Sequence, residues 1–600
     1  MKRTPVLILF LLLLQQLGAQ DEKKIVILHT NDLHSRLTGY APESEYSPFS
    51  VNDDNTIGGF ARIAAIIKEE KERNTGTTLV VDAGDFLMGT LFQGLETSTG
   101  FQLRLMKTMG YDAVCIGNHE FDYGPEKLAD ILTSAVNRGE IPPLLLSNAE
   151  FDVNKPEDNK LEDLFKSGVV SRKFILERDN LKIGFFSLLG KVADDNAAFA
   201  PPVTFSKQTT EAKKMVKELQ AQNCDIIICL SHSGVSYTND KTWEGEDYEL
   251  ARKVKGIDVI ISGHTHTRLD KPVIVNGTPI VQTGEYGQNV GKLTLTFKSG
   301  NLNLSDYILI PVDDRIKGDA DVHKLIEEQK DKITSEILKP LGMDYKKSVA
   351  ETDFLLECNE QGDIQGSNLG PMVADAIHSY INKHSKSGTD ISMVAVGVIR
   401  DKIVPGLQSA PDVFRLMSMG QGKDGVPGYP LARLYVTGKE LKSILEILQV
   451  AYKSTPGNYC YYSGMRAEFD PDMGMLKKIS KIEIINPDGS IKKVDFSKKS
   501  DDLYSITANS YMLEFIGIIK KMSFGLINVV PKNAEGIPIS DMKSAVVDLD
   551  ETSDGLQEGK EWLALMEYLS SMKDINGNGI PDIDTKYKEA IQTFFVEKNP

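Results

Sequence analysis

The sequence is poor in the features that define several protein classes. Its 600 residues contain only five cysteines, scattered and odd in number, which excludes a disulfide framework. It has no block of lysine and arginine, and its formal net charge of -17 disfavours nucleic acid or an anionic membrane surface as a partner. Nothing after residue 20 is apolar over a membrane-spanning length, so no stable membrane anchor is expected. No feature requires a protein partner.

The first twenty residues have the layout of a secretory signal peptide. Lys2 and Arg3 precede an apolar run over residues 6–14, and a polar stretch then ends at Ala19 and Gln20, where we expect cleavage. The run is too short to span a bilayer, and no cysteine follows it that could carry a lipid. The mature protein is therefore expected in a periplasm or outside the cell.

The length and composition predict two domains. A chain of 600 residues with 41% hydrophobic and 26% charged content is too long for one ordinary domain. Residues 21–318 alternate short β-branched runs with helical patterns, which is typical of an α/β layered fold. A charged linker helix is predicted over 319–345, a second α/β domain over 346–550, and a C-terminal helix with a polar loop over 551–600.

Five apolar runs in the first half are each followed at once by a polar cluster. The runs, at residues 25–28, 79–81, 114–116, 226–230 and 257–261, are apolar on both faces, as central strands between helices must be. The clusters are Asn31-Asp32-Leu33-His34, Asp82-Ala83-Gly84-Asp85, Gly117-Asn118-His119-Glu120-Phe121-Asp122, Ser231-His232-Ser233-Gly234 and Gly263-His264-Thr265-His266. Because ligand sites of open α/β sheets lie beyond the carboxyl ends of the strands, these clusters should converge.

The chemistry of the clusters predicts a metal centre. They hold five of the nine histidines, and the mixture of carboxylate, amide and imidazole suits Zn, Mn, Fe or Co. Seven side chains are candidate ligands: Asp32, His34, Asp85, Asn118, His232, His264 and His266. Two divalent ions fit this number better than one, because Asp85 can bridge them, and such a pair clamps the oxygens of a phosphoryl group. One cluster alone would be read as a capped turn or a core histidine, but five in series favour metal.

With these motifs the chain resembles the calcineurin-like metallophosphoesterases, and as a whole the bacterial 5'-nucleotidase and UDP-sugar hydrolase family. The resemblance implies a four-layer sandwich of two mixed sheets flanked by helices, followed by a smaller α/β substrate-binding domain. It implies one ion held by Asp32, His34, Asp85 and His266, and another held by Asp85, Asn118, His232 and His264. It also implies that His119, oriented by Asp122, is catalytic and stabilises charge on the transition state or leaving oxygen, with Glu120 a structural neighbour.

The C-terminal half is similar to the nucleotide-binding domain of that family. Within the segment 391–406, Arg400 is the candidate for gripping a phosphate, because its guanidinium can form paired hydrogen bonds. The chain departs from the family at 396–399, 417–422 and 508–513, where the expected glycine and Pro-Phe-Gly-Asn motifs are replaced. Tyr461 or Tyr462, together with Tyr511, are candidates for sandwiching the base, with ordinary packing as the alternative for each.

The tail contains a stretch, residues 574–584, that resembles a calcium loop of the D-x-N-x-N-G type. Its candidate ligands are Asp574, Asn576, Asn578 and Asp582, although the twelfth position is Thr585 rather than glutamate. A bound Ca²⁺ would be structural. A simple Asn/Gly turn is the alternative.

The sequence therefore predicts a hydrolase that cleaves a nucleotide phosphate ester with metal-activated water. UDP-sugars, cyclic nucleotides or a non-nucleotide phosphoester are alternative substrates for the same chemistry. A non-catalytic binding protein that keeps the fold is a third hypothesis. The intact pair of His119 and Asp122 disfavours it.

Overall fold

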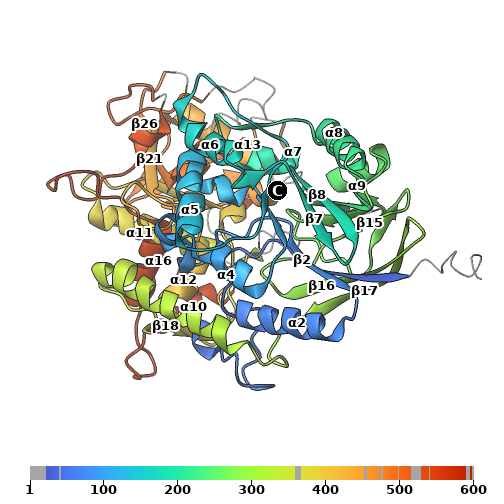
Figure 1. Ribbon diagram of the computed structural model, residues 1–600. Coiled ribbons are helices and arrows are strands. Elements are labelled where there is room, and N and C mark those ends of the chain that lie inside the picture. Colours follow the sequence, from blue (N-terminus) through green and yellow to red (C-terminus); the bar gives the residue numbers. More distant parts are fainter. Residues whose placement is uncertain are drawn as a thin grey trace, which may run out of the picture. The chain divides into compact units, whose positions relative to one another are not determined.

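A computed structural model describes residues 22–39, 42–238, 240–358, 366–451, 456–470, 472–474, 477–497, 499–514, 529–539, 541–589 and 595–597 (Figure 1). The predicted signal peptide lies outside these residues. The chain forms two compact units: the first comprises residues 1–36, 48–87 and 97–323, and the second 37–47, 88–96 and 324–600. Across the described part of the chain, no helix combines the length and apolarity needed to cross a bilayer.

The first unit contains two mixed sheets. A seven-stranded sheet has the order β17-β16-β1-β2-β3-β4-β6, and a six-stranded sheet has the order β14-β15-β13-β10-β8-β7. The first is built from β1 (Lys23–Thr30), β2 (Thr77–Asp82), β3 (Ala113–Cys115), β4 (Leu144–Leu145), β6 (Val170–Ser171), β16 (Asn289–Lys298) and β17 (Asn301–Pro311). The second is built from β7 (Lys173–Arg178), β8 (Leu181–Leu189), β10 (Ile226–His232), β13 (Val259–Ser262), β14 (Val273–Val275) and β15 (Thr278–Val281). All five apolar runs lie in or overlap parallel strands of these sheets.

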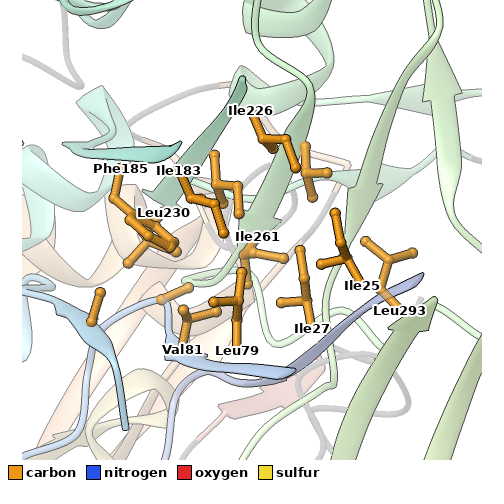
Figure 2. Packing of buried hydrophobic residues seen from close by; sticks show 14 of the residues in the cluster. Ile25, Ile27, Leu79, Val81, Ile183, Phe185, Ile226, Leu230, Ile261 and Leu293 are labelled. Atoms are coloured by element: carbon orange, nitrogen blue, oxygen red, sulfur yellow. The ribbon is translucent and has the colours of Figure 1, made fainter. Parts of the chain in front are cut away.

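The core of this unit lies between the two sheets. Side chains of β1 and β2, such as Ile27 and Val81, pack with Phe185 and Leu230 from β8 and β10 (Figure 2). A second core covers the other face of the six-stranded sheet beneath α8 (Gln208–Ala221) and α9 (Glu246–Lys253). The other side of the seven-stranded sheet lies toward α2 (Phe60–Arg73), which is consistent with Val26 being fully buried there (Figure 1). The predicted four-layer sandwich is therefore confirmed.

The second unit is a smaller α/β structure. Its main sheet has the order β21-β26-β19-β22, formed by β19 (Ile391–Ala395), β21 (Leu431–Thr437), β22 (Cys460–Ser463) and β26 (Leu503–Asn509). A second sheet contains β23 (Met465–Phe469), β24 (Ile479–Ile485), β25 (Ile491–Lys493) and β27 (Phe595–Glu597). The helices include α11 (Leu369–His384), α12 (Ala410–Leu416), α13 (Gly438–Ala451), α14 (Ser510–Glu514) and α16 (Glu561–Ser570), and β18 (Ser348–Thr352) pairs with β20 (Gly406–Ser409). Within the segment 319–345, for which a linker helix is predicted, the structure has α10 (Ala320–Ile333), and the division between the units falls within this helix.

A buried ionic network joins distant segments of the second unit. The guanidinium of Arg415 lies 2.7 Å from Asp412, 3.1 Å from Asp401 and 3.5 Å from Glu43. The carboxylate of Glu43 also forms a salt bridge with the ammonium of Lys330 at 3.0 Å. Removing one member would leave an opposite charge buried without its partner, which is costly. The network therefore fixes the segment 37–47, which contributes Glu43, within this unit.

Candidate metal centre

Strand register brings the predicted clusters to one edge of each sheet. In the first sheet, Thr30 pairs with Asp82, and Asp82 in turn pairs with Val114. In the second sheet, Ser231 at the end of β10 pairs with Ser262 at the end of β13. Parallel strands that end level with one another deliver the loops that follow them to a common place, so convergence follows from the topology.

The candidate ligands form one connected cluster. Three groups of side chains each have their ligand atoms within 4.8 Å of one another. The groups are Asp32, His34 and His266; His34, Asp85 and His119; and Asp85, His232 and His264. Nε2 of His232 lies 3.0 Å from Oδ2 of Asp85 and 3.1 Å from Oδ1 of Asn118. All seven predicted ligands therefore meet, and Asp85 is shared by two of the groups.

The backbone at these ligands is strained. Five of the seven have positive φ: Asp32 at 51°, His34 at 48°, Asp85 at 57°, His264 at 76° and His266 at 53°. Residues other than glycine rarely adopt this conformation, which costs on the order of 1–3 kcal/mol at each position. Aspartate and histidine tolerate this conformation better than most other residues, but glycine would adopt it at lower cost. Carboxylates and imidazoles at five such positions in one cluster are consistent with a need for their side chains.

Glycines allow the loops to approach one another closely. Gly84 has φ of 98°, and a Cβ atom there would lie 2.9 Å from Nδ1 of His232. A Cβ atom at Gly117 would collide with the carboxylate of Asp85. Neither glycine can therefore carry a side chain without displacing a candidate ligand.

Hydrogen bonds fix the orientation of the histidines. Nδ1 of His232 donates to the carbonyl oxygen of Ala83 at 2.9 Å, which leaves Nε2 facing the cluster. Nδ1 of His119 lies 2.7 Å from the carboxylate of Asp122, while the backbone N–H of His119 donates to Asp85 at 2.9 Å. Both rings therefore have one nitrogen held by a neighbour and the other available to the centre.

Two buried acids organise the loops, and one of them was missed by the sequence analysis. Glu120 accepts backbone N–H groups from Asp85 at 3.1 Å, Leu87 at 2.9 Å and Gly117 at 2.6 Å, and burial raises the pKa of its carboxyl to about 8. Asp247 of α9 accepts from the hydroxyls of Ser231 at 2.5 Å and Ser262 at 2.6 Å, so it joins the loops after β10 and β13. No motif surrounds Asp247 in the sequence, because its partners are distant along the chain.

The electrostatics of the cluster favour a bound cation. Burial lowers the pKa of His232, but the carboxylates of Asp85 and Asp32 outweigh this effect and raise it to about 10. Burial lowers the pKa of His264 to about 3, so this imidazole is neutral and able to act as a ligand near neutral pH. The oxygen and nitrogen donors, the negative potential and the fixed ring orientations fit divalent metal ions.

The substrate-binding candidates in the second unit are in different environments. Arg400 is half-buried, and its backbone N–H donates to Leu416 at 2.9 Å. Tyr461 and Tyr462 are 0% and 4% exposed in β22, where the ring of Tyr461 packs closely against Gly370. Both rings are thus core residues in this structure.

Tyr511 is the second residue of α14 and is half-buried. Its ring stacks on Tyr429, with centroids 5.3 Å apart and planes 10° from parallel. Tyr429 was not among the sequence candidates, because it belongs to none of the motifs that resemble the family. The stack supports Tyr511 from one side.

The candidate calcium loop is an exposed turn near β18. Asp574 accepts the backbone N–H groups of Gly577 at 2.7 Å and Gly579 at 2.8 Å, and Asp582 accepts that of Ile575 at 2.6 Å. The side-chain amides of Asn576 and Asn578 both contact the carboxylate of Glu351 in β18. The loop thus has a carboxylate beside it that comes from outside the motif.

Comparison with known proteins identifies two matched regions. Residues 25–268 match the family described as calcineurin-like phosphoesterase, and residues 348–517 match the 5'-nucleotidase C-terminal domain. The chain is 27% identical over 524 residues to the trifunctional nucleotide phosphoesterase protein YfkN of Bacillus subtilis (strain 168), covering 81% of this chain and 32% of that protein. It is 27% identical over 550 residues to the 5'-nucleotidase of Bos taurus, covering 85% of this chain and 86% of that protein.

A solved structure has the same fold. The 5'-nucleotidase precursor from Thermus thermophilus is 21% identical, with a TM-score of 0.67, and the match covers 96% of this chain and 100% of that one. The chain spans about a third of the length of YfkN but most of the bovine protein.

Proposed function

We propose that this chain, which matches the calcineurin-like phosphoesterases over residues 25–268 and the 5'-nucleotidase C-terminal domain over residues 348–517, hydrolyses phosphate esters of nucleotides. The observation that carries the proposal is the convergence of seven oxygen and nitrogen ligands in one connected cluster, within which Asp85 and His34 each belong to two groups. The names of the bovine and Bacillus relatives, a 5'-nucleotidase and a nucleotide phosphoesterase, support the substrate class.

The proposed ligand sets share Asp85. Asp32, His34 and His266 complete one set, and Asn118, His232 and His264 complete the other. Two bound divalent ions, Zn, Mn, Fe or Co, would supply charge neutralisation at the phosphoryl group and an acidified water. The donor set contains no thiolate, which favours such ions over a structural zinc site.

His119 would act on the substrate rather than hold an ion. Asp122 accepts from Nδ1 at 2.7 Å, which fixes the orientation of the ring. The ring of His119 lies 5.1 Å from that of His34, at the border of the cluster. A proton or hydrogen bond delivered there offsets negative charge that develops on the phosphoryl or leaving oxygen.

The second unit would bind the rest of the nucleotide. Arg400 can pair with a phosphate through its planar guanidinium. Tyr511, supported by Tyr429, offers a ring on which a base can stack. UDP-sugars, cyclic nucleotides and non-nucleotide esters remain alternative substrates for the same centre.

The signal-peptide pattern supports export of the mature protein to a periplasm or out of the cell. N-terminal sequencing of protein recovered from the producing cells should then begin after Ala19 or Gln20. An N-terminus at Met1 would overturn this part of the proposal.

We further propose that the 574–584 loop binds Ca²⁺, with Glu351 replacing the carboxylate missing at Thr585. Calcium should raise the melting temperature of the wild-type protein and not that of Asp574→Ala. An equal response of both proteins would contradict the assignment. The ion would be structural, because the loop supplies no group to the metal centre described above.

Chromatography of the hydrolysis products tests the catalytic proposal directly, because cleavage of UDP-glucose or of a cyclic nucleotide releases no inorganic phosphate. The purified mature protein is stripped and reloaded with Mn²⁺ or Zn²⁺, then offered AMP, ATP, UDP-glucose, a cyclic nucleotide and an aryl phosphate. Preference for nucleotides supports the proposal, with His119→Ala as the inactive control. Turnover of the aryl phosphate alone would exclude nucleotides as the substrate class, and no turnover of any ester would favour a binding role.

A further inference from the structure

A sixth loop, residues 283–288, borders the metal centre without being part of any of the five clusters. Asn31 holds this loop, since its side chain donates to the carbonyl of Gly284 at 2.6 Å and accepts the N–H of Thr283 at 2.8 Å. The backbone N–H of Tyr286 donates to the carbonyl of Asp32 at 2.7 Å. The loop is therefore fixed to the residues that supply the first ligands.

Two side chains of this loop face the candidate ligands. The carboxylate of Glu285 contacts Nδ1 of His266. The ring of Tyr286 lies edge-on to His34, with centroids 5.5 Å apart. Nε2 of His266 then faces the opposite way, 3.6 Å from Oδ1 of Asp32 and 3.2 Å from Nε2 of His34.

The two sides of the centre differ in how a histidine is held. His232 is oriented by a neutral carbonyl, that of Ala83, and it is fully buried. His266 is oriented by a carboxylate, and its side chain is 25% exposed. A charged acceptor makes the imidazole a stronger ligand than a carbonyl does, and it also restrains a ring that packing alone holds loosely.

We propose that Glu285 is a positioning residue for the metal centre, which directs Nε2 of His266 toward the ion shared with Asp32 and His34. The proposal rests on the proposed function, because it assumes that the cluster binds metal. Loss of an outer carboxylate of this kind lowers metal affinity by about 10- to 100-fold. The effect should fall on one of the two ions.

The test measures metal content and pairing, not turnover alone. Wild-type protein, Glu285→Ala and Glu285→Gln are loaded with Mn²⁺ and dialysed against a weak chelator. Ions per chain are then measured by elemental analysis, and their pairing by electron paramagnetic resonance. We expect two paired ions in the wild type, one isolated ion in Glu285→Ala, and an intermediate affinity in Glu285→Gln, whose amide oxygen can still accept from Nδ1.

Glu177→Gln is the matched control, since Glu177 is 75% exposed on β7. It should retain two paired ions. Two tightly held, paired ions in Glu285→Ala would overturn the role of Glu285 and leave the metal centre intact. Fewer than two ions in the wild type would instead overturn the metal centre itself, so the two failures are distinguishable. If Glu285 only stabilised the fold, Glu285→Ala would lower the melting temperature while both ions stayed bound and paired.

Discussion

The metal centre of the first unit and the predicted nucleotide-binding residues of the second differ in how directly the sequence predicts them. In the first unit, every predicted ligand lies at the end of a parallel strand or in the loop after it, and all seven lie together. In the second, Tyr461 and Tyr462 are buried, and Tyr511 stacks on a tyrosine that no motif indicated. Topology alone gathers loops at the ends of strands, whereas an aromatic binding surface depends on which rings the core leaves exposed.

The largest expected effect comes from the shared ligand. Asp85→Asn should abolish measurable phosphate release and lower the content of both ions, because both sets lose their common carboxylate. Asp306→Asn, on an exposed position of β17, is the control and should behave as the wild type. Full metal content and activity in Asp85→Asn would contradict the shared role.

His119→Ala should separate catalysis from metal binding. We expect kcat to fall by about 10²- to 10⁴-fold, which is the range for loss of a positioned acid or base, while two ions remain bound. Steady-state kinetics and elemental analysis measure the two quantities. A loss of metal equal to that in Asp85→Asn would show instead that His119 is a ligand.

Two tyrosine substitutions sharpen the contrast within the second unit. Tyr461→Ala should lower the free energy of unfolding by about 3–5 kcal/mol, as for other buried aromatic residues. Tyr511→Ala should leave stability nearly unchanged and raise KM for a nucleotide, since base stacking contributes about 1–3 kcal/mol. Urea unfolding and KM for AMP against an aryl phosphate distinguish the two. An unchanged KM in Tyr511→Ala would remove Tyr511 from the substrate site.

The smallest effect concerns a histidine outside the centre. His29 in β1 is fully buried, stacks on Tyr307, and has its pKa lowered by burial to about 3. The unfolded chain binds a proton at His29 near pH 6.5 and the folded chain does not, so stability is present above that pH and falls as the pH is lowered toward 3. Between about pH 8 and pH 5 the loss is about 2 kcal/mol.

Urea unfolding of wild type and His29→Phe across this pH range measures that loss. The difference between the two proteins isolates His29 from the histidines of the metal centre. The variant should lose about 2 kcal/mol less than the wild type on acidification. Parallel curves for the two proteins would show that His29 does not contribute.

The sequence predicts the layered fold and the ligand set well because every ligand lies at or just after the end of one of five parallel strands. It does not predict Asp247 or Glu285, whose contacts join residues that are far apart along the chain. It also does not reveal the positive φ of Asp32 or His264, because both residue types occupy ordinary turns elsewhere. In the second unit, the consecutive residues Cys460, Tyr461 and Tyr462 of β22 fit a strand buried on both faces, and nothing in that run separates a core tyrosine from a binding one.

Anomalous X-ray scattering from crystals loaded with Mn²⁺ tests the two-metal centre most directly. The account predicts two peaks roughly 3.5 to 4 Å apart, on either side of Asp85. One peak should contact Asp32, His34 and His266, and the other Asn118, His232 and His264. A single peak, or none among these side chains, would contradict it.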